Sequence, residues 1–193
     1  MQTPKHHQLI YVSSPDRGLE ILLKLWPRII EKFPDAKLHV YYGFVLFDKM
    51  FRDNPERMAW KDKIMRLLKQ KGVYYYGRVG QDKLARAEQK CGVWVYPTFF
   101  QEINCISALS CQSHGLVPVT MNAYALKETV GSGTKVDGDI YDKKTQEEWL
   151  RALFAYIGNK KRWIEESKKA KEFAKEFSWD NIANEWLKVI EEK

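Results

Sequence analysis

The sequence predicts an α/β protein built on a doubly wound parallel sheet. Short apolar runs alternate with amphipathic segments, and the apolar runs end at loops rich in Gly, Pro or polar residues. Strands that alternate with helices form a parallel sheet that helices cover on both faces. No internal repeat, low-complexity segment or linker interrupts the pattern. The 193 residues therefore predict a single domain, 1–193, with a helical C-terminal extension over 144–193.

Five apolar runs are the expected strands, at residues 9–12, 38–42, 73–76, 93–96 and 117–121. Apolar side chains at helical spacing, with Pro or Gly near the segment ends, predict the helices. They are expected at 17–32 (with a kink at Pro27), 55–71, 80–90, 105–113, 124–130, 144–158 and 160–192. The last segment is expected to break around 177–179, where Ser178 can cap the final helix. Gly43 opens an aromatic-rich loop.

Composition narrows the function classes. The chain has 45% hydrophobic and 30% charged residues, as soluble globular proteins do. No apolar run approaches the roughly 20 residues of a membrane span, and the N-terminus lacks a signal-peptide pattern. Three cysteines, an odd number without ligand spacing, argue against a disulfide framework and favour a reducing, cytoplasmic setting.

Basic residues are concentrated in the first half of the chain. Residues 1–100 hold 18 Lys and Arg against 10 Asp and Glu, an excess of eight, whereas residues 142–193 hold 12 against 11. The excess over 52–71 suits an anionic ligand, a peripheral membrane contact or nucleic acid, but a basic outer helix face is the simpler interpretation. The aromatic residues at 74–76, 94 and 99–100 are expected in strands and core, so nucleic acid gains little support.

The loop after the first strand is one candidate site. Ser13, Ser14, Arg17 and Gly18 stand at the start of the first helix. Backbone N–H groups at a helix start, with an arginine beside them, can hold a phosphate oxyanion. The alternative is an ordinary helix start that Ser14 or Asp16 caps, with Arg17 in solvent. Taken alone, the loop favours this alternative.

Glu102 is a second candidate, because it lies where the fourth apolar run gives way to a helix. Ligands of open α/β sheets bind at this edge, beside the carboxyl ends of strands. Free amides near Asn104, Cys105 and Ile106 suit an anion, whereas the Glu102 carboxylate suits sugar hydroxyls. The alternative is a surface glutamate beside a helix cap. Cys105 could have a lowered thiol pKa at a helix start, although a small packing residue is the simpler interpretation.

A third loop, Gly77-Arg78-Val79-Gly80, reaches the same edge. Its glycines would let a ligand approach the backbone, although a plain turn is the commoner reason for them. The chain has no GxGxxG or GxxxxGK[ST] motif, so dinucleotide oxidoreductases and P-loop NTPases lose support. No nucleophile–histidine arrangement can be argued. Structural roles are expected for the four histidines, which show no metal-ligand spacing: His6, His7, His39 and His114.

In this order, the loops resemble the nucleotide-sugar-binding C-terminal half of GT-B glycosyltransferases, of the family 4 type (glycosyl transferases group 1). The resemblance covers nearly the whole chain. It rests on residues 13–18, 34–38, 77–79 with Leu84, 96–102, 115–119 and 177–180. Each piece is a weak signal alone, whereas the ordered set is fairly specific.

The resemblance implies a Rossmann-like half of a GT-B fold that binds a nucleoside-diphosphate sugar in carbohydrate biosynthesis. It also implies retaining transfer without a metal or another cofactor. Glu102 matches the first Glu of the family's E-x7-E motif, near the transferring sugar. Arg17-Gly18 matches a Lys-Gly pair that neutralises the diphosphate, and Ser13 or Ser14 stands where the family has Arg. The resemblance further places the diphosphate near Asn104, Cys105 and Ile106, and the nucleoside near Gly77, Arg78, Val79 and Ser110.

Two departures from the family pattern matter. The second Glu of E-x7-E, which holds the ribose, is Ser110 here, and losing one such contact costs about 1–3 kcal/mol. The N-terminal acceptor-binding domain of GT-B enzymes is absent from the sequence, so we expect it to be missing or to be a separate polypeptide. The last helix would then expose an apolar stripe that seeks a partner. Its residues are Ile182, Trp186, Val189 and Ile190.

The leading hypothesis is a donor-binding domain of a retaining glycosyltransferase, weakly active or inactive without an acceptor domain. The competing hypothesis is a degenerate, non-catalytic module that serves as a partner-binding subunit, for which Ser110 is the main argument. A sugar-nucleotide epimerase of the same architecture is the third, but the sequence offers no acid and base residues for it.

Overall fold

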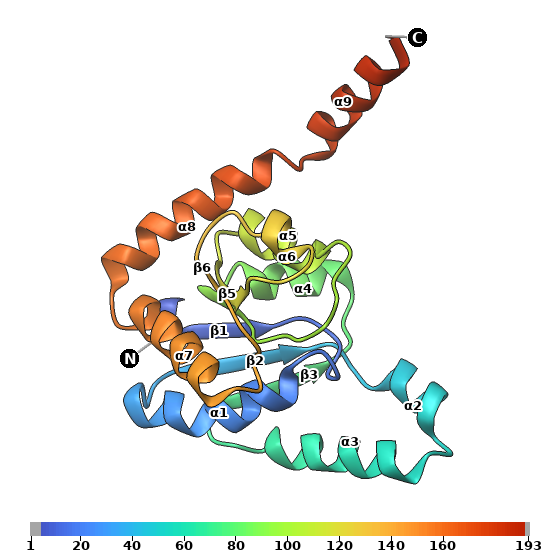
Figure 1. The fold of residues 1–193 in the computed structure, drawn as a ribbon, viewed down its shortest axis with the longest axis vertical. Coiled ribbons are helices and arrows are strands. Elements are labelled where there is room, and N and C mark those ends of the chain that lie inside the picture. Colours follow the sequence, from blue (N-terminus) through green and yellow to red (C-terminus); the bar gives the residue numbers. More distant parts are fainter. Residues whose placement is uncertain (1–4, 192–193) are drawn as a thin grey trace.

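The computed structural model describes residues 5–191 and confirms the predicted fold class. Within them, parallel strands form one sheet in the order β3-β2-β1-β4-β5-β6. Figure 1 shows helices on both sides of this sheet. The strand order reverses between β1 and β4, which is where doubly wound sheets bind ligands. The strands are β1 (Gln8–Tyr11), β2 (Lys37–Tyr41), β3 (Val73–Gly77), β4 (Val93–Tyr96), β5 (Val117–Met121) and β6 (Thr134–Val136).

The helices follow the predicted order, with shifted ends. The predicted helix over 55–71, for example, ends at Leu67. A 3-10 turn (Lys5–His7) precedes β1. The α-helices are α1 (Leu19–Lys32), α2 (Val45–Phe51), α3 (Pro55–Leu67), α4 (Gln81–Glu88), α5 (Ile106–Ser113), α6 (Leu126–Thr129), α7 (Lys143–Ile157), α8 (Lys160–Lys175) and α9 (Trp179–Glu191). Residue 192, which the prediction included in the last helix, lies outside the described residues.

Besides the 3-10 turn, two elements were not predicted, and tertiary contacts explain both. α2 replaces most of the expected aromatic-rich loop, because Phe44 and Phe47 are buried against Trp60 of α3. β6 is short and is held by its pairing with β5, where Thr134 lies opposite Val119. Contacts between distant segments therefore create these elements, and local sequence pattern does not reveal them.

The core lies around the central strands. Every residue of β4 is buried, including Trp94 as predicted. The expectation that Tyr74, Tyr76 and Phe99 belong to the core is wrong, because their exposed fractions are 44%, 42% and 43%. The two tyrosines belong to β3, which is an edge strand of the sheet, and Phe99 lies in the loop after β4.

α1 continues through Pro27, although proline has no N–H to donate to the carbonyl four residues earlier. The carbonyl left without a helical partner is that of Leu23. Gln70, beyond α3, donates from Nε2 to the Leu23 oxygen at 2.9 Å and to the Leu67 oxygen at 2.9 Å. A side chain from another element thus replaces the missing helical hydrogen bond.

We predict that Gln70→Ala lowers the free energy of unfolding by about 1–3 kcal/mol, because the partly buried Leu23 carbonyl would lose its donor. Urea denaturation measures the change. Gln89→Ala is the matched control, since Gln89 is exposed and its substitution should change stability by less than about 0.5 kcal/mol. Equal effects of the two substitutions would contradict the role given to Gln70.

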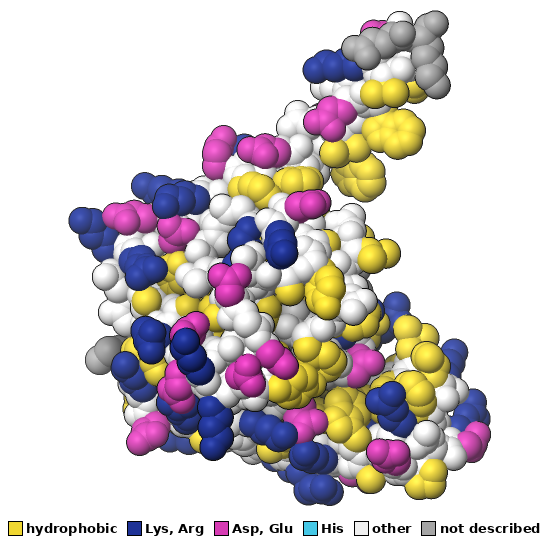
Figure 2. All heavy atoms as spheres, viewed as in Figure 1, with side chains coloured by type: hydrophobic (Ala, Val, Ile, Leu, Met, Phe, Trp, Pro, Cys, Tyr) yellow, Lys and Arg dark blue, Asp and Glu magenta, His cyan; other side chains and the backbone are white. Residues whose placement is uncertain are grey.

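α9 projects from the rest of the domain (Figure 1) and has no buried residue. The predicted cap is confirmed, because the Asn181 N–H donates to Ser178 Oγ at 3.3 Å. Figure 2 shows hydrophobic side chains gathered along one side of this helix. Trp186, Val189 and Ile190 are 68%, 60% and 63% exposed, whereas Ile182 is half-buried. No helix within residues 5–191 combines the length and apolarity needed to cross a membrane.

Candidate functional site

Glu102 lies just beyond the carboxyl end of β4 and is largely buried, with 8% exposed. Its Oε1 accepts hydrogen bonds from the Tyr96 hydroxyl at 2.6 Å and from Arg17 Nη1 at 3.3 Å. Its Oε2 has no hydrogen-bond partner within residues 5–191. Burial and, second, the bond to Glu102 raise the pKa of Tyr96, so this hydroxyl remains a donor. The carboxylate is thus fixed through one oxygen, and the other can accept from a ligand.

Arg17 lies in the loop after β1, on the other side of the strand-order reversal from Glu102, and the two residues are 85 positions apart in the sequence. Its guanidinium lies 3.8 Å from the centre of the Phe100 ring and contacts Glu102. About a third of the side chain, 35%, is exposed. A guanidinium has five N–H donors, so most of them stay available to a ligand. The structure therefore brings together the two predicted residues that carry opposite charges.

The loop that carries Arg17 is fixed by two tyrosines at strand ends. The Tyr11 hydroxyl donates to the Ser14 carbonyl at 2.8 Å, and the Ser13 and Tyr96 hydroxyls are 3.2 Å apart. The alternative in which Ser14 or Asp16 caps the first helix is wrong, because the N-cap of α1 is Gly18 and no side chain caps it. A local contact from Tyr11 and a tertiary contact from Tyr96 hold this loop in place of a side-chain cap.

Gly18 lets the first loop touch the loop after β4. Its φ is 114°, a conformation that other residues rarely adopt. A Cβ added there would lie 2.3 Å from the Pro97 carbonyl oxygen. Only glycine therefore fits where the loops that carry Arg17 and Glu102 meet.

The start of α5 completes this edge. Cys105 is its N-cap, and no side chain caps the helix, so its first N–H groups lack helical acceptors. Burial raises the pKa of the Cys105 thiol to about 12, so the hypothesis of a lowered pKa is wrong. Asn104 and Ile106 are exposed. Ser107 donates to the Val12 carbonyl at 3.3 Å and ties the helix start to the end of β1.

Within residues 5–191, the two remaining predicted regions form no hydrogen bond or ion pair with Glu102 or Arg17. The Ser110 hydroxyl, on α5, donates to Oε2 of Glu88 at 2.7 Å. Glu88 is almost fully buried and also contacts His114 Nδ1 at 2.8 Å. Residues 77–79 form no hydrogen bond or ion pair with Glu102 or Arg17 within the described part of the chain. Gly77 has a positive φ of 65°, Arg78 is exposed and Val79 is half-buried.

Sequence reasoning missed Tyr11, Tyr96, Phe100 and Glu88. The two tyrosines were identifiable in part, because each is the last residue of a central strand and so reaches the ligand-binding edge. Phe100 and Glu88 carry no local signal. Their roles depend on contacts with Arg17 and Ser110, which lie on other elements.

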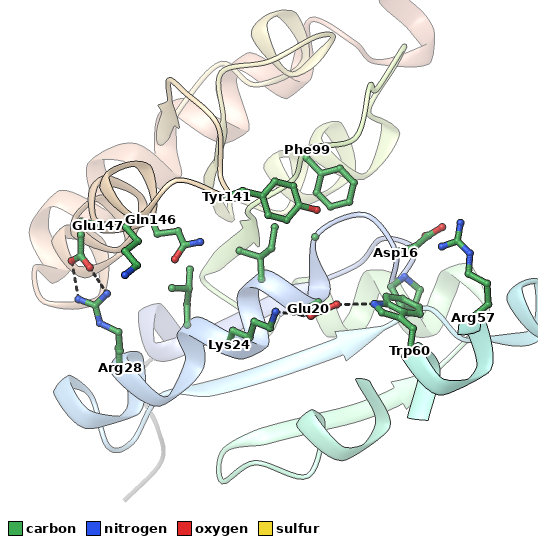
Figure 3. A pocket seen from close by; sticks show the side chains of 15 residues that line it. Asp16, Glu20, Lys24, Arg28, Arg57, Trp60, Phe99, Tyr141, Gln146 and Glu147 are labelled. Carbon is green, nitrogen blue, oxygen red and sulfur yellow. Dashed lines mark hydrogen bonds and ion pairs between the residues drawn. The ribbon is translucent and has the colours of Figure 1, made fainter. Parts of the chain in front are cut away.

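A cavity of about 500 Å³ lies beside this edge, between α1, α3 and the segment that leads into α7. Figure 3 shows Phe99 and Tyr141 above α1, and Trp60 on the opposite side. Two of its carboxylates are paired within the cavity, Glu20 with Lys24 and Glu147 with Arg28. Within residues 5–191 the third, Asp16, forms no ion pair. Glu102 is not among its lining residues. We therefore place the candidate site at Glu102, whose carboxylate is buried and anchored by Tyr96, whereas the Asp16 carboxylate of this cavity is exposed.

Known proteins resemble this chain over most of its length. GDP-Man:Man(3)GlcNAc(2)-PP-Dol alpha-1,2-mannosyltransferase of Dictyostelium discoideum is 21% identical over 183 residues, which is 91% of this chain and 35% of that protein. The structure of the GtfA/B complex matches with a TM-score of 0.78 at 12% identity, covering 99% of this chain and 37% of that one. HepE of Anabaena, solved with UDP and glucose, matches with a TM-score of 0.72 at 14% identity, covering 96% of this chain and 48% of that one.

These likenesses to solved structures show the fold. The chain spans about a third to a half of the length of the proteins that it matches. The family described as Glycosyl transferases group 1 matches residues 5–177, nearly the whole chain. The protein therefore belongs to the glycosyl transferases group 1 family, with the α/β fold of a GT-B glycosyltransferase domain.

Proposed function

We propose that this chain is the donor-binding domain of a glycosyltransferase and holds a nucleoside-diphosphate sugar between residues 13–18 and the start of α5. The observation that carries the proposal is the buried Glu102 carboxylate, which is anchored by Tyr96 and Arg17 through one oxygen. Family membership supports the ligand class. Glu102 would be the catalytic residue that accepts from a hydroxyl of the transferring sugar through Oε2.

The diphosphate is assigned to the positive groups at the same edge. Arg17 offers a guanidinium already oriented by Phe100 and Glu102, and the uncapped start of α5 offers backbone N–H groups and the positive end of a helix dipole. Such preoriented donors stabilise charge that develops on a leaving group. They would do so without a metal or cofactor. Retaining transfer is supported by the match of Glu102 to the first Glu of the family motif.

The nucleoside is assigned to residues 77–79 and Ser110. Because the Ser110 hydroxyl uses its O–H to donate a hydrogen bond to Glu88, its oxygen can still accept a hydrogen bond from a ribose hydroxyl. Glu88, 1% exposed, would act through Ser110 in place of the carboxylate that the family has at this position. This arrangement supports a working donor site over a degenerate module.

We further propose that a second domain binds the acceptor and covers α9. Ile103 and Ile106, at the edge that carries Glu102, are 97% and 72% exposed, and the apolar side of α9 is exposed as well. The chain covers 35% of the mannosyltransferase that it resembles, which leaves length for another domain.

The three cysteines are free and buried, which supports a cytoplasmic setting.

Calorimetric titration with UDP, GDP and ADP in EDTA tests the proposal. We expect saturable binding of one nucleotide, and tighter binding of its sugar conjugate. Glu102→Gln should weaken the sugar conjugate about tenfold or more, because a charged acceptor contributes about 1.5–3 kcal/mol, and should not weaken the free nucleotide, since it removes a negative charge near the diphosphate.

Glu128→Gln is the matched control, since Glu128 is exposed and lies on α6. No binding at millimolar nucleotide would favour the non-catalytic module. Binding that requires a divalent metal would contradict the metal-independent part of the proposal.

A further inference from the structure

A second concave surface, which we call the basic groove, lies between α4 and the β1–β3 part of the sheet. Its volume is about 920 Å³, near the upper end of ligand sites, which run from roughly 300 to 1,000 Å³. Its cations are Lys5, Lys83, Arg86 and Lys90. Its lining includes none of Arg17, Glu102 and Ser110 and no residue of 77–79, although Tyr76 adjoins that last segment.

The four cations lack acidic neighbours in the groove. Within residues 5–191 none of them forms an ion pair, and no lining residue is Asp or Glu. Of the acidic residues on α4, Asp82 does not line the groove, and the Glu88 carboxylate is bonded to Ser110 of α5. Burial, and second the charge of Lys171, lower the pKa of Lys5. The negative charge of an anion bound here would oppose both effects and favour the charged form of Lys5.

The sheet side of the groove is a row of stacked rings. The His39 ring lies between those of Tyr74 and Tyr76, and its centre is 5.6 Å from the first and 5.8 Å from the second. The ring of Tyr76 also stacks on that of Tyr41, with centres 4.6 Å apart. Because the rings cover one another's faces, they offer mainly edges and hydroxyl groups to a ligand. Burial raises the pKa of Tyr41 to about 12 and lowers that of His39 to about 4. At neutral pH the tyrosine hydroxyl therefore stays a donor and His39 is uncharged.

We propose that the basic groove binds an acidic saccharide chain that carries carboxylate or phosphate groups. Such a chain needs cations for its anionic groups and hydrogen-bond partners for its hydroxyls, and the groove offers both. A single-stranded nucleic acid needs open ring faces on which its bases stack, and a flat membrane surface does not fit a concave groove. The inference rests on the proposed function in one respect, namely that the acceptor is a saccharide chain: the second domain would hold its reacting end, and the groove would hold a remote part of the same chain.

The test is a titration of the full chain with a hyaluronan hexasaccharide, which carries carboxylates. Lys83→Glu with Arg86→Glu should weaken binding about tenfold or more. The matched control is Lys144→Glu with Lys188→Glu, which changes the net charge equally on α7 and α9, away from the groove. The control should bind within about threefold of the unchanged protein. Circular dichroism confirms that each variant folds.

Absence of hexasaccharide binding, equal weakening in both double variants, or equal binding of neutral maltohexaose would overturn the proposal. Tighter binding of an oligothymidylate of matched length, or of phosphatidylserine vesicles, would also overturn it. UDP, GDP and ADP titrations on the same variants report the donor site separately. A failed nucleotide titration beside intact hexasaccharide binding would count against the proposed function and leave the groove assignment standing.

Discussion

Gly18→Ala is expected to lower the free energy of unfolding by about 3 kcal/mol or more. Alanine strains a backbone at φ 114°, which costs about 1–3 kcal/mol. The added Cβ would also lie 2.3 Å from the Pro97 carbonyl oxygen, and such overpacking costs about 1–3 kcal/mol more. The atom it meets belongs to the backbone, so relief requires the two site loops to move apart. Urea denaturation, monitored through tryptophan fluorescence, measures the decrease in the free energy of unfolding.

Gly80→Ala is the matched control for this prediction. Gly80 has an ordinary φ of −68°, and a Cβ added there meets nothing within 4 Å. Its substitution should change the free energy of unfolding by less than about 0.5 kcal/mol. Equal stabilities of the two variants would show that the loops of Arg17 and Glu102 do not meet as described.

Arg17→Ala is expected to weaken nucleoside-diphosphate binding about 10–100-fold. Charge-assisted hydrogen bonds contribute about 1.5–3 kcal/mol each, and the variant would also leave Glu102 without its ion-pair partner, close to an anionic ligand. Arg17→Lys keeps the charge but not the planar arrangement of donors. Its affinity for the nucleoside diphosphate should therefore lie between that of the unchanged protein and that of Arg17→Ala. Calorimetric titration with the nucleotide that binds the unchanged chain gives the comparison.

Arg66→Ala removes the same charge from an exposed position on α3 and serves as the control. Its affinity should stay within about threefold of the unchanged protein, because an exposed distant charge is screened by salt. The free nucleoside, which lacks phosphates, should bind Arg17→Ala as well as it binds the unchanged chain. An Arg17→Ala variant that binds the diphosphate as tightly as the unchanged protein would contradict the assignment of Arg17 to the donor site.

The sequence was sufficient for the fold class and for proposing the two charged residues that meet at the candidate site. Alternating strand and helix patterns depend on local periodicity, so β1 to β5 and most helices could be predicted. Arg17 and Glu102 could be identified because each follows an apolar run at its carboxyl end. The order of the loops was sufficient to identify the family, which the match over residues 5–177 shows.

Only the tertiary structure decided what these residues contact. The 3.3 Å contact of Arg17 with Glu102 joins residues 85 positions apart, and the fit of Gly18 against Pro97 exists only once β1 and β4 are neighbours. α2 forms through packing against α3, and β6 forms through pairing with β5. Ser110 on α5 contacts Glu88 on α4 only because the fold places these two helices together. The physical reason is the same throughout: local pattern determines which segments become strands and helices, whereas long-range packing determines which side chains meet.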